Sequence, residues 1–237
     1  MAATQVQLKP NVFLSLDDVK DWLGITQAMV DKDSTLDNRL ARLLNSMTDM
    51  AERHIHGPIK TRSIPAEFHD GDSSNTIIPD FWPVRDVGSI YVDFNRAFTA
   101  PTLVEKSNYI LRGAPDPTFP NQVRGSDIVL RDDNDTSIVG RIFTGSTVGS
   151  IKIAYTAGWG ADQTEIPADL INAILLGVEY YYRKRDSKDL GVKSKSVNGQ
   201  SISFTQGLPK EVTDILDTYT DYTLGRNNRP QTNTFTL

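Results

Sequence analysis

The chain has 237 residues, no cysteine and a formal net charge of −5 at pH 7, with 38% hydrophobic and 23% charged residues. This length allows one large domain or two small ones with a sizeable buried core. The acidic balance argues against a dedicated nucleic-acid-binding protein with a basic face, and the lack of cysteine excludes disulfides and thiolate metal sites. The composition fits a protein made in a reducing cytoplasm. The first residues, MAATQVQLKPNVF, lack the pattern of a secretion signal, and no membrane span is predicted.

Two helices are predicted near the N-terminus, after an extended arm over residues 1–13. Ser15 is the expected N-cap of the first, with Asp18 at the capping-box position and Gly24 after its end. A polar connection over residues 26–34 follows.

The second helix is the clearest amphipathic segment in the sequence. Its apolar residues, first leucines and then Met47, Ala51 and Ile55, recur at three- and four-residue spacing from about Thr35 to Ile55, and the pair Gly57-Pro58 ends it.

Between residues 57 and 164 the hydrophobic period changes to two, which predicts a β-rich block. Clusters of Gly, Pro, Asp and Asn separate its short apolar runs and are typical of turns. The predicted strands are Ile59–Ile64, Asn75–Ile78, Val87–Phe94, Tyr109–Arg112, Asp127–Leu130, Gly140–Phe143 and Ser150–Tyr155.

A third helix is predicted from Pro167 to Arg185, because proline suits the first helical position and the basic end suits the helix dipole. Its apolar side chains cover most of the circumference and leave only a narrow polar strip. Such a helix must be covered on several sides. It is either the central helix of this chain's own core or a helix shared with a neighbouring copy.

The C-terminal part holds a predicted long, polar and flexible loop over residues 186–206. A fourth helix follows from Pro209 to about Tyr222, with Gly225 ending it. The tail over residues 226–237 has little to bury and is predicted to be flexible until something binds it.

Together these elements predict an α+β fold. A small bundle of four helices, over residues 14–56 and 165–225, forms the core, and the β-rich region over 57–164 is inserted between the second and third helices.

Motifs for enzyme chemistry are missing from the sequence, and neither catalysis nor a cofactor is expected. The run Gly145–Gly149 lacks the lysine of a phosphate-binding loop, and Gly158-Trp159-Gly160 is typical of a turn. Asp132–Thr136 resembles part of a calcium loop but lacks the distal glutamate, so a hairpin turn is favoured. The three histidines, His54, His56 and His69, could in principle bind a metal, although nothing in their spacing fixes the geometry.

The only basic cluster in the sequence lies at the end of the third helix and in the loop after it: Arg183, Lys184, Arg185, Lys188, Lys193 and Lys195. Its plain interpretation is a helix C-cap and a solvated loop, and its functional interpretation is a patch that meets an acidic partner or passing DNA.

Three segments, in this order, resemble the head–tail connector proteins of tailed phages, also called adaptor or head-completion proteins. They are FLSLDDVKDWLGIT with LDNRLARLLNSMTDMAERHIHGPI, then IIPDFWPVRDVGSIYVDFN, then IKIAYTAGWG with IPADLINAILLGVEYYYRKRD. The resemblance covers about residues 13–225.

The resemblance implies a structural virion protein at the head–tail interface, made in the bacterial cytoplasm. It implies a ring of identical subunits, dodecameric by portal symmetry, that extends the DNA channel under the portal protein. The next partner would be a stopper or tail-terminator protein, and genomic DNA would pass without sequence-specific binding. The alternatives are another β-rich neck or tail binding module and a metal-dependent enzyme.

Two sets of contact residues are expected. A ring needs heterologous contacts, and tyrosines are good interface residues. The subunit-interface set is Ile171, Leu176, Tyr180, Tyr181 and Tyr182. The set expected to contact the portal or line the channel is Arg183, Lys184, Arg185, Lys188, Lys193, Lys195, Arg226, Arg229 and the terminal Phe235, Thr236 and Leu237.

Overall fold

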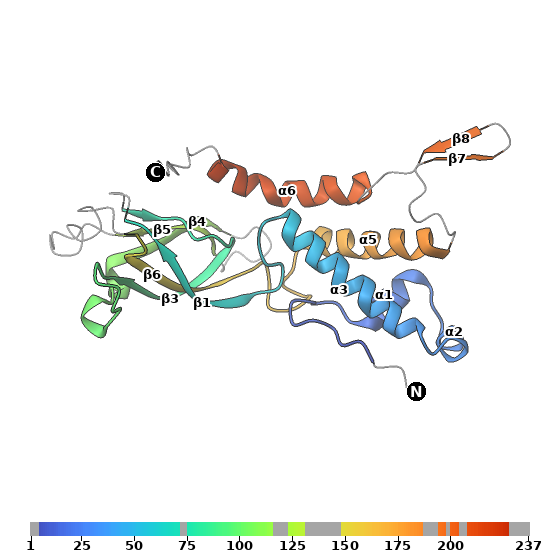
Figure 1. Cartoon of the computed structure of the whole chain (residues 1–237), viewed down its shortest axis with the longest axis horizontal. Helices are drawn as coiled ribbons and strands as arrows, with labels where there is room; N and C mark the ends of the chain where they lie inside the picture. The colour runs from blue at the N-terminus through green and yellow to red at the C-terminus, as the bar shows by residue number, and fades with distance from the viewer. Residues whose placement is uncertain are drawn as a thin grey trace, which may run out of the picture. The chain divides into compact units, whose positions relative to one another are not determined.

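The computed structural model describes residues 5–71, 75–115, 123–130, 148–186, 194–197, 200–203 and 208–227. The chain forms two compact units: unit 1 is Met1–His56 with Ile166–Leu237, and unit 2 is Gly57–Glu165. Unit 1 is mostly helical, and unit 2 is built on an antiparallel sheet (Figure 1). The prediction of a mixed α and β protein is confirmed. No described helix is long and apolar enough to cross a membrane.

Unit 1 has five α-helices within the described residues, where four were predicted. They are α1 (Leu16–Leu23), α2 (Gln27–Lys32), α3 (Leu36–His54), α5 (Ala168–Asp186) and α6 (Lys210–Asn227).

Helix α2 was not predicted, because its segment was interpreted as a polar connection. It has six residues, buries none of them and has no side-chain cap, so it has no strong sequence signal. The end of α6 was also predicted wrongly, since the helix continues through Gly225 to Asn227. A glycine inside a helix costs only about 1 kcal/mol relative to alanine, which does not by itself stop a helix.

The ends of α1 confirm the predicted capping. The Ser15 hydroxyl accepts a hydrogen bond from the Asp18 amide at 3.1 Å, and the Asp18 carboxylate accepts one from the Ser15 amide at 2.8 Å. Gly24, with φ 67°, forms the left-handed C-cap.

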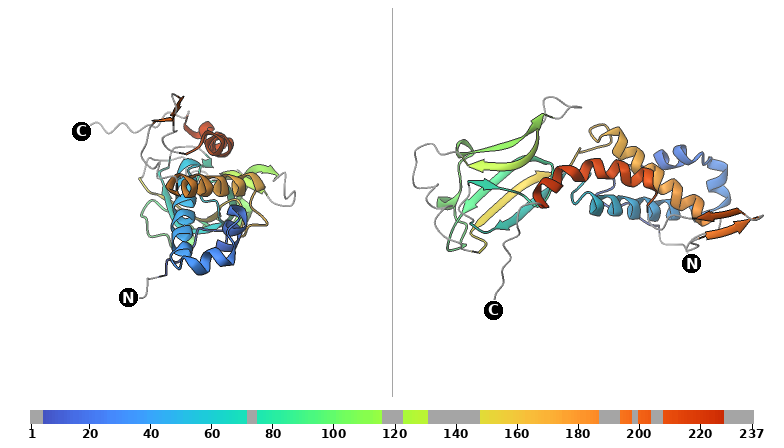
Figure 2. Two further views of the ribbon diagram at one scale, coloured as in Figure 1. Left: turned by 90° about the vertical axis from the view of Figure 1, so that its right-hand side faces the viewer. Right: turned by 90° about the horizontal axis from the view of Figure 1, so that it is seen from above.

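Helix α3 packs against α5 and also contacts α1 and α6, and Figure 2 shows these helices from two further sides. Its buried side chains recur every three or four residues, which is why one helix can serve several neighbours. They include Leu36, Leu40, Leu44, Met47 and Ala51.

The N-terminal arm follows α3 as an extended segment. The Asn45 side chain accepts a hydrogen bond from the Lys9 amide at 2.9 Å and donates one to the Gln7 carbonyl at 3.0 Å. Asn38 accepts from the Val6 amide at 2.7 Å. These α3 side chains form hydrogen bonds with backbone groups of the arm that a neighbouring β-strand would otherwise satisfy.

Two short antiparallel strands, β7 (Ser194–Val197) and β8 (Gln200–Ser203), lie in the segment predicted to be a loop. The loop prediction is therefore wrong for these eight residues, and its remainder lies outside the described part of the chain. The Asn-Gly pair at 198–199 is a strong hairpin signal in the sequence that would have indicated them.

Unit 2 contains the six strands β1 (Arg62–His69), β2 (Thr76–Ile77), β3 (Val84–Val92), β4 (Tyr109–Pro115), β5 (Val123–Leu130) and β6 (Ile151–Ala157). All pairs are antiparallel, in the order β1-β6-β3-β5-β2, with β4 paired to β5. The 3-10 turns Ala100–Thr102 and Lys106–Asn108 connect β3 to β4. Each of these strands overlaps a predicted one, with shifted ends. The predicted strand Gly140–Phe143 and the predicted hairpin turn Asp132–Thr136 lie outside the described residues.

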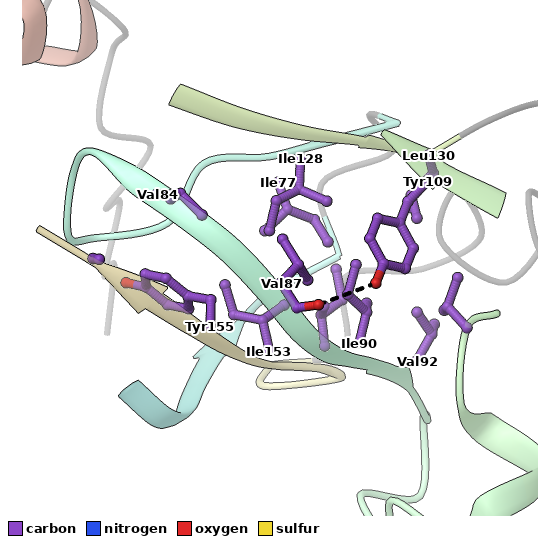
Figure 3. Close-up of a cluster of buried hydrophobic side chains, with 13 residues drawn as sticks. Ile77, Val84, Val87, Ile90, Val92, Tyr109, Ile128, Leu130, Ile153 and Tyr155 are labelled. Carbon is purple, nitrogen blue, oxygen red and sulfur yellow. Dashed lines mark hydrogen bonds between the residues drawn. The ribbon is translucent and has the colours of Figure 1, made fainter. Parts of the chain in front are cut away.

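The core of unit 2 forms on one face of this sheet (Figure 3). Along β6 buried and half-buried residues alternate, so Ile151, Ile153 and Tyr155 face the core. Tyr109 is also buried there and donates a hydrogen bond to the Val87 carbonyl at 3.4 Å.

The predicted turn at Gly158–Gly160 follows β6. Gly158 has φ 135°, and a Cβ on it would lie 2.5 Å from the Thr61 Cα, so only glycine fits. Trp159 beyond it is buried and packs edge-on against Trp82, with ring centroids 4.8 Å apart.

Candidate subunit-interface surface on helix α5

Helix α5 is buried along its middle and contacts α1, α3 and α6. Leu170, Ala173, Ile174, Leu175 and Val178 are its buried apolar residues. The prediction that several neighbours cover this helix is confirmed. The same packing leaves the C-terminal end of α5 less covered, since every described side chain after Val178 is half-buried or exposed.

Polar contacts hold α5 in place at both ends. Near its start, the Tyr219 hydroxyl of α6 donates to the Asp169 carboxylate. Near its end, the Trp22 indole of α1 donates to Glu179 at 2.8 Å, and Glu179 forms an ion pair with Arg183 at 2.6 Å. These contacts fix the C-terminal end of α5 relative to α1, and its N-terminal end relative to α6.

The three tyrosines of the predicted interface are all half-buried. The rings of Tyr180 and Tyr181 meet edge-on at 5.3 Å between centroids. The Lys184 ammonium donates to the Tyr180 hydroxyl at 3.0 Å and lies 5.1 Å from the centre of its ring. Burial raises the pKa of Tyr181, and the neighbouring Tyr180 raises it further. Such partly covered aromatic side chains suit a protein–protein contact.

The two apolar members of the set, Ile171 and Leu176, are half-buried as well. They have surface left to cover, although the structure contains no second copy that would test their role. The interface prediction for these five residues stays a prediction.

The basic residues at the end of α5 directly follow the tyrosines in the sequence, and Lys184 contacts Tyr180. Arg183 and Arg185 are exposed, and Lys184 is half-buried. The Thr35 hydroxyl and amide, as hydrogen-bond donors, lower the pKa of Asp33, and the charges of Arg39 and Arg185 add to this effect. Of the other predicted contact residues, Lys195 lies in β7 and Arg226 in α6, with no description of their side chains. Lys188, Lys193, Arg229, Phe235, Thr236 and Leu237 lie outside the described residues.

Two of the three histidines considered as metal ligands, His54 and His69, contact carboxylates. His54 Nε2 lies 2.7 Å from the Asp217 carboxylate of α6, and His69 Nε2 lies 2.6 Å from Glu67 within β1. In the part of the chain that the structure describes, no group of three or more His, Asp or Glu is arranged to hold a metal ion.

Two features of this surface were not predicted from the sequence. Gly177 lets α3 approach α5 closely, and an isolated glycine inside a helical pattern is a signal for such an approach. Helical spacing places Trp22 with Val19 and Leu23 on the face of the first helix predicted to be buried, but Trp22 is 42% exposed.

Comparison with known proteins identifies the family. A family model described as HCP, head completion protein, matches residues 12–222. This match covers most of the chain, so the chain belongs to the head completion protein family. The family predicted from the sequence is confirmed, and with it the structural head–tail connector role of that family. No match is found among the curated proteins.

Solved structures with a similar fold come from gene transfer agent (GTA) particles. A chain from the neck of an empty GTA particle computed with C6 symmetry is 17% identical, with a TM-score of 0.56 over 92% of this chain and 95% of that one. A chain from the neck of a native GTA particle computed with C12 symmetry is also 17% identical, with a TM-score of 0.53 over 92% and 94%. A chain from the virion of a native GTA particle has 17% identity and a TM-score of 0.51 over 92% and 95%. At this identity the likeness is one of fold.

Proposed function

We propose that this chain is a subunit of a dodecameric ring in the virion neck, beneath the portal protein. The ring extends the DNA channel and joins the filled head to a stopper or tail-terminator protein. The family match over residues 12–222 carries the proposal. The similar folds in neck structures computed with C6 and C12 symmetry support a ring, because both symmetries are compatible with twelve subunits.

In this proposal the helical unit is the core of the subunit and the β unit is an insertion in it. Tyr180, Tyr181 and Tyr182 contact a neighbouring subunit together with Ile171 and Leu176. The basic end of α5 contacts the portal or faces the channel. The net charge of −5 suits a channel that lets DNA slide, because retained phosphate contacts would slow it.

We also propose that the protein has no catalytic activity and acts by assembly alone. The family is one of structural proteins. A host-cytoplasmic origin follows from the same role.

The mass of the protein, measured alone and after mixing with its portal protein, tests the ring. The expected result is a complex of the portal with twelve copies of this chain. A monomer that neither assembles alone nor binds the portal at micromolar concentration would contradict the proposal.

Alanine variants test the interface residues. Tyr181→Ala with Tyr182→Ala should weaken ring assembly at least about tenfold, since buried interface tyrosines are frequent hot spots. Thr218→Ala is the matched control, because Thr218 is an exposed residue of α6 in the same unit. Equal assembly of the tyrosine variant and the control would contradict the assignment of the interface.

A further inference from the structure

A row of side chains crosses four neighbouring segments of unit 2, on the face opposite to the core. Phe68 of β1 pairs with Lys152 of β6, Lys152 pairs with Tyr91 of β3, and Tyr91 forms a bridge to Leu103. Directly paired residues point to the same face of a sheet. With strands about 4.8 Å apart, the row is roughly 14 Å wide.

The row is largely apolar and open to solvent. Phe68 is 56% exposed and Leu103 is 43% exposed. Phe98, from the loop after β3, packs on Phe68 with ring centroids 5.6 Å apart. We call Phe68, Lys152, Tyr91, Leu103 and Phe98 the aromatic row.

The aromatic row contains one positive charge. The Lys152 ammonium lies 5.8 Å from the ring centre of Tyr91 and 5.7 Å from that of Phe98. Among the described residues it has no carboxylate partner. The row therefore presents an apolar surface with a cation fixed over two aromatic rings, and a partner carboxylate would complement it.

The loop that holds Phe98 is tightly constrained. The buried Asp93 carboxylate accepts hydrogen bonds from the amides of Asn95 at 2.8 Å and Phe98 at 2.9 Å. Arg96 and Phe98 have φ values of 57° and 47°, in the left-handed region that non-glycine residues rarely adopt. Strained backbone of this kind is concentrated at functional surfaces.

Unit 1 carries an exposed surface over α1 and α2 that combines apolar residues with negative charge, whereas the aromatic row combines them with a positive charge. Trp22 and Met29 are 42% and 45% exposed, and α2 buries none of its residues. The exposed carboxylates of Asp17, Asp21 and Asp31 accompany them. Residues 16–32 contain four aspartates and two lysines, a net charge of −2. We call Trp22, Met29, Asp17, Asp21 and Asp31 the acidic face.

We propose that the aromatic row of one copy binds the acidic face of the next copy around the ring. This inference rests on the proposed function, because a closed ring needs two different surfaces on each subunit that fit each other. Both surfaces have exposed apolar residues at their centre, and their charges are opposite. The acidic face also continues toward the predicted tyrosine contact, since Trp22 bonds Glu179, the residue before Tyr180.

Disulfide trapping tests the contact, because the chain has no cysteine of its own. Ala28→Cys places a thiol on the acidic face, and Thr99→Cys places one beside Phe98; both positions are exposed. The two single variants are mixed, and rings are formed either without or with portal protein. A disulfide should then join one Ala28→Cys chain to one Thr99→Cys chain. Its yield should exceed that of either variant alone about tenfold, and a chain with both cysteines should form a ladder.

Charge reversal makes the test specific. Lys152→Glu in the Thr99→Cys chain should lower the yield about tenfold, since like charges repel. Asp21→Lys in the Ala28→Cys chain should then restore most of it. Lys106→Glu is the matched control, because Lys106 is 82% exposed, outside the aromatic row, and it should leave the yield unchanged.

The possible outcomes distinguish failure of the proposed contact from failure of the proposed ring. If rings form but mixed and single variants crosslink equally, the contact is wrong and the ring stands. The contact is also wrong if rings of the Lys152→Glu variant crosslink as well as rings of the parent. If these rings in addition fail to bind the portal or a tail protein, the aromatic row binds that protein and not a second copy. If no ring forms under either condition, both proposals fail.

Discussion

Gly177 of α5 lies directly against Met47 of α3: a Cβ added at Gly177 would lie 2.3 Å from the Met47 sulfur and 3.0 Å from its Cγ. The central helices of unit 1 approach this closely because one of them has no side chain at the crossing.

Gly177→Ala should therefore destabilise unit 1. Overpacking costs about 1–3 kcal/mol, whereas alanine gains only about 1 kcal/mol of helix propensity over glycine. The flexible end of Met47 can relieve part of the clash, so Gly177→Val should cost more than Gly177→Ala. Urea midpoints followed by the helical circular dichroism signal measure the order.

A second substitution identifies the cause. Met47→Ala combined with Gly177→Ala should cost less than the sum of the single changes, because the shortened side chain makes room for the new methyl. A Gly177→Ala variant more stable than the parent would show that the helices are not in close contact.

The N-terminal arm depends on Asn45, which is 9% exposed and bonds the backbone of both Gln7 and Lys9. Asn45→Ala should cost about 1–2 kcal/mol, since it removes two hydrogen bonds at a buried site. The amide of Lys9 should exchange hydrogen much faster, while the α3 amides stay protected. Asn45→Asp keeps the acceptor for the Lys9 amide but places a second oxygen against the Gln7 carbonyl, so Lys9 should exchange more slowly than in Asn45→Ala. Unchanged exchange in Asn45→Ala would mean that the buried Val12 and Leu14 hold the arm without it.

The loop after β3 depends in the same way on Asp93. Asp93→Ala should release the amides of Asn95 and Phe98 and cost about 1–3 kcal/mol, because charge-assisted hydrogen bonds are lost. Relaxation of the loop should withdraw Phe98 from Phe68 and Lys152. The nuclear Overhauser contacts between the two phenylalanine rings provide the measurement, with Asp86→Ala, a change of an exposed carboxylate within β3, as the control. Persistence of these contacts in Asp93→Ala would show that ring packing alone positions the loop.

Regular elements with a strong period were predictable from sequence. The amphipathic helix from Thr35 to Ile55 corresponds to α3, and the capping box at Ser15 is present as expected. Periodicity reports which face of an element is buried, so it works where burial decides the structure.

Features decided by tertiary contacts were not predictable in this way. Helix α2 buries no residue and so has no apolar period. The aromatic row depends on which strands are neighbours: Phe68 and Tyr91 meet Lys152 only because β6 lies between β1 and β3. Pairing order is a long-range property that alternation along a single strand does not contain. The predicted α5 interface rests on local sequence, and the masses of assembled complexes are needed to test it.

Glu67 is a buried carboxylate whose charge is stabilised by three donors. It accepts hydrogen bonds from the Tyr155 hydroxyl, from the Asp80 amide at 2.7 Å and from His69 Nε2 at 2.6 Å. Burial alone would raise the pKa of Glu67, but these hydrogen bonds together lower it below its ordinary value. Burial, and then the bond to Glu67, raise the pKa of Tyr155, so that its hydroxyl stays protonated and can donate.

A carboxyl group whose pKa is lower in the folded state stabilises the fold above its unfolded pKa. This contribution is lost as the pH falls through the folded value. Since the unfolded pKa of glutamate is about 4.3, the stability of unit 2 should be full at neutral pH and fall below about pH 4. Glu67→Gln cannot ionise. At pH 7 it should be less stable than the parent by about 1–3 kcal/mol, and the difference should shrink as the pH is lowered.

Urea unfolding of both proteins between pH 3 and pH 7, followed by tryptophan fluorescence, measures this difference, because Trp82 and Trp159 are buried in unit 2. Tyr155→Phe is the matched variant: it removes one donor to Glu67 and leaves the carboxylate in place. The stability of Tyr155→Phe should still fall with decreasing pH, but the fall should begin at a higher pH. The reason is that the pKa of Glu67 rises when a donor is lost. A Glu67→Gln variant with the same pH profile as the parent would assign the acid sensitivity to other carboxylates.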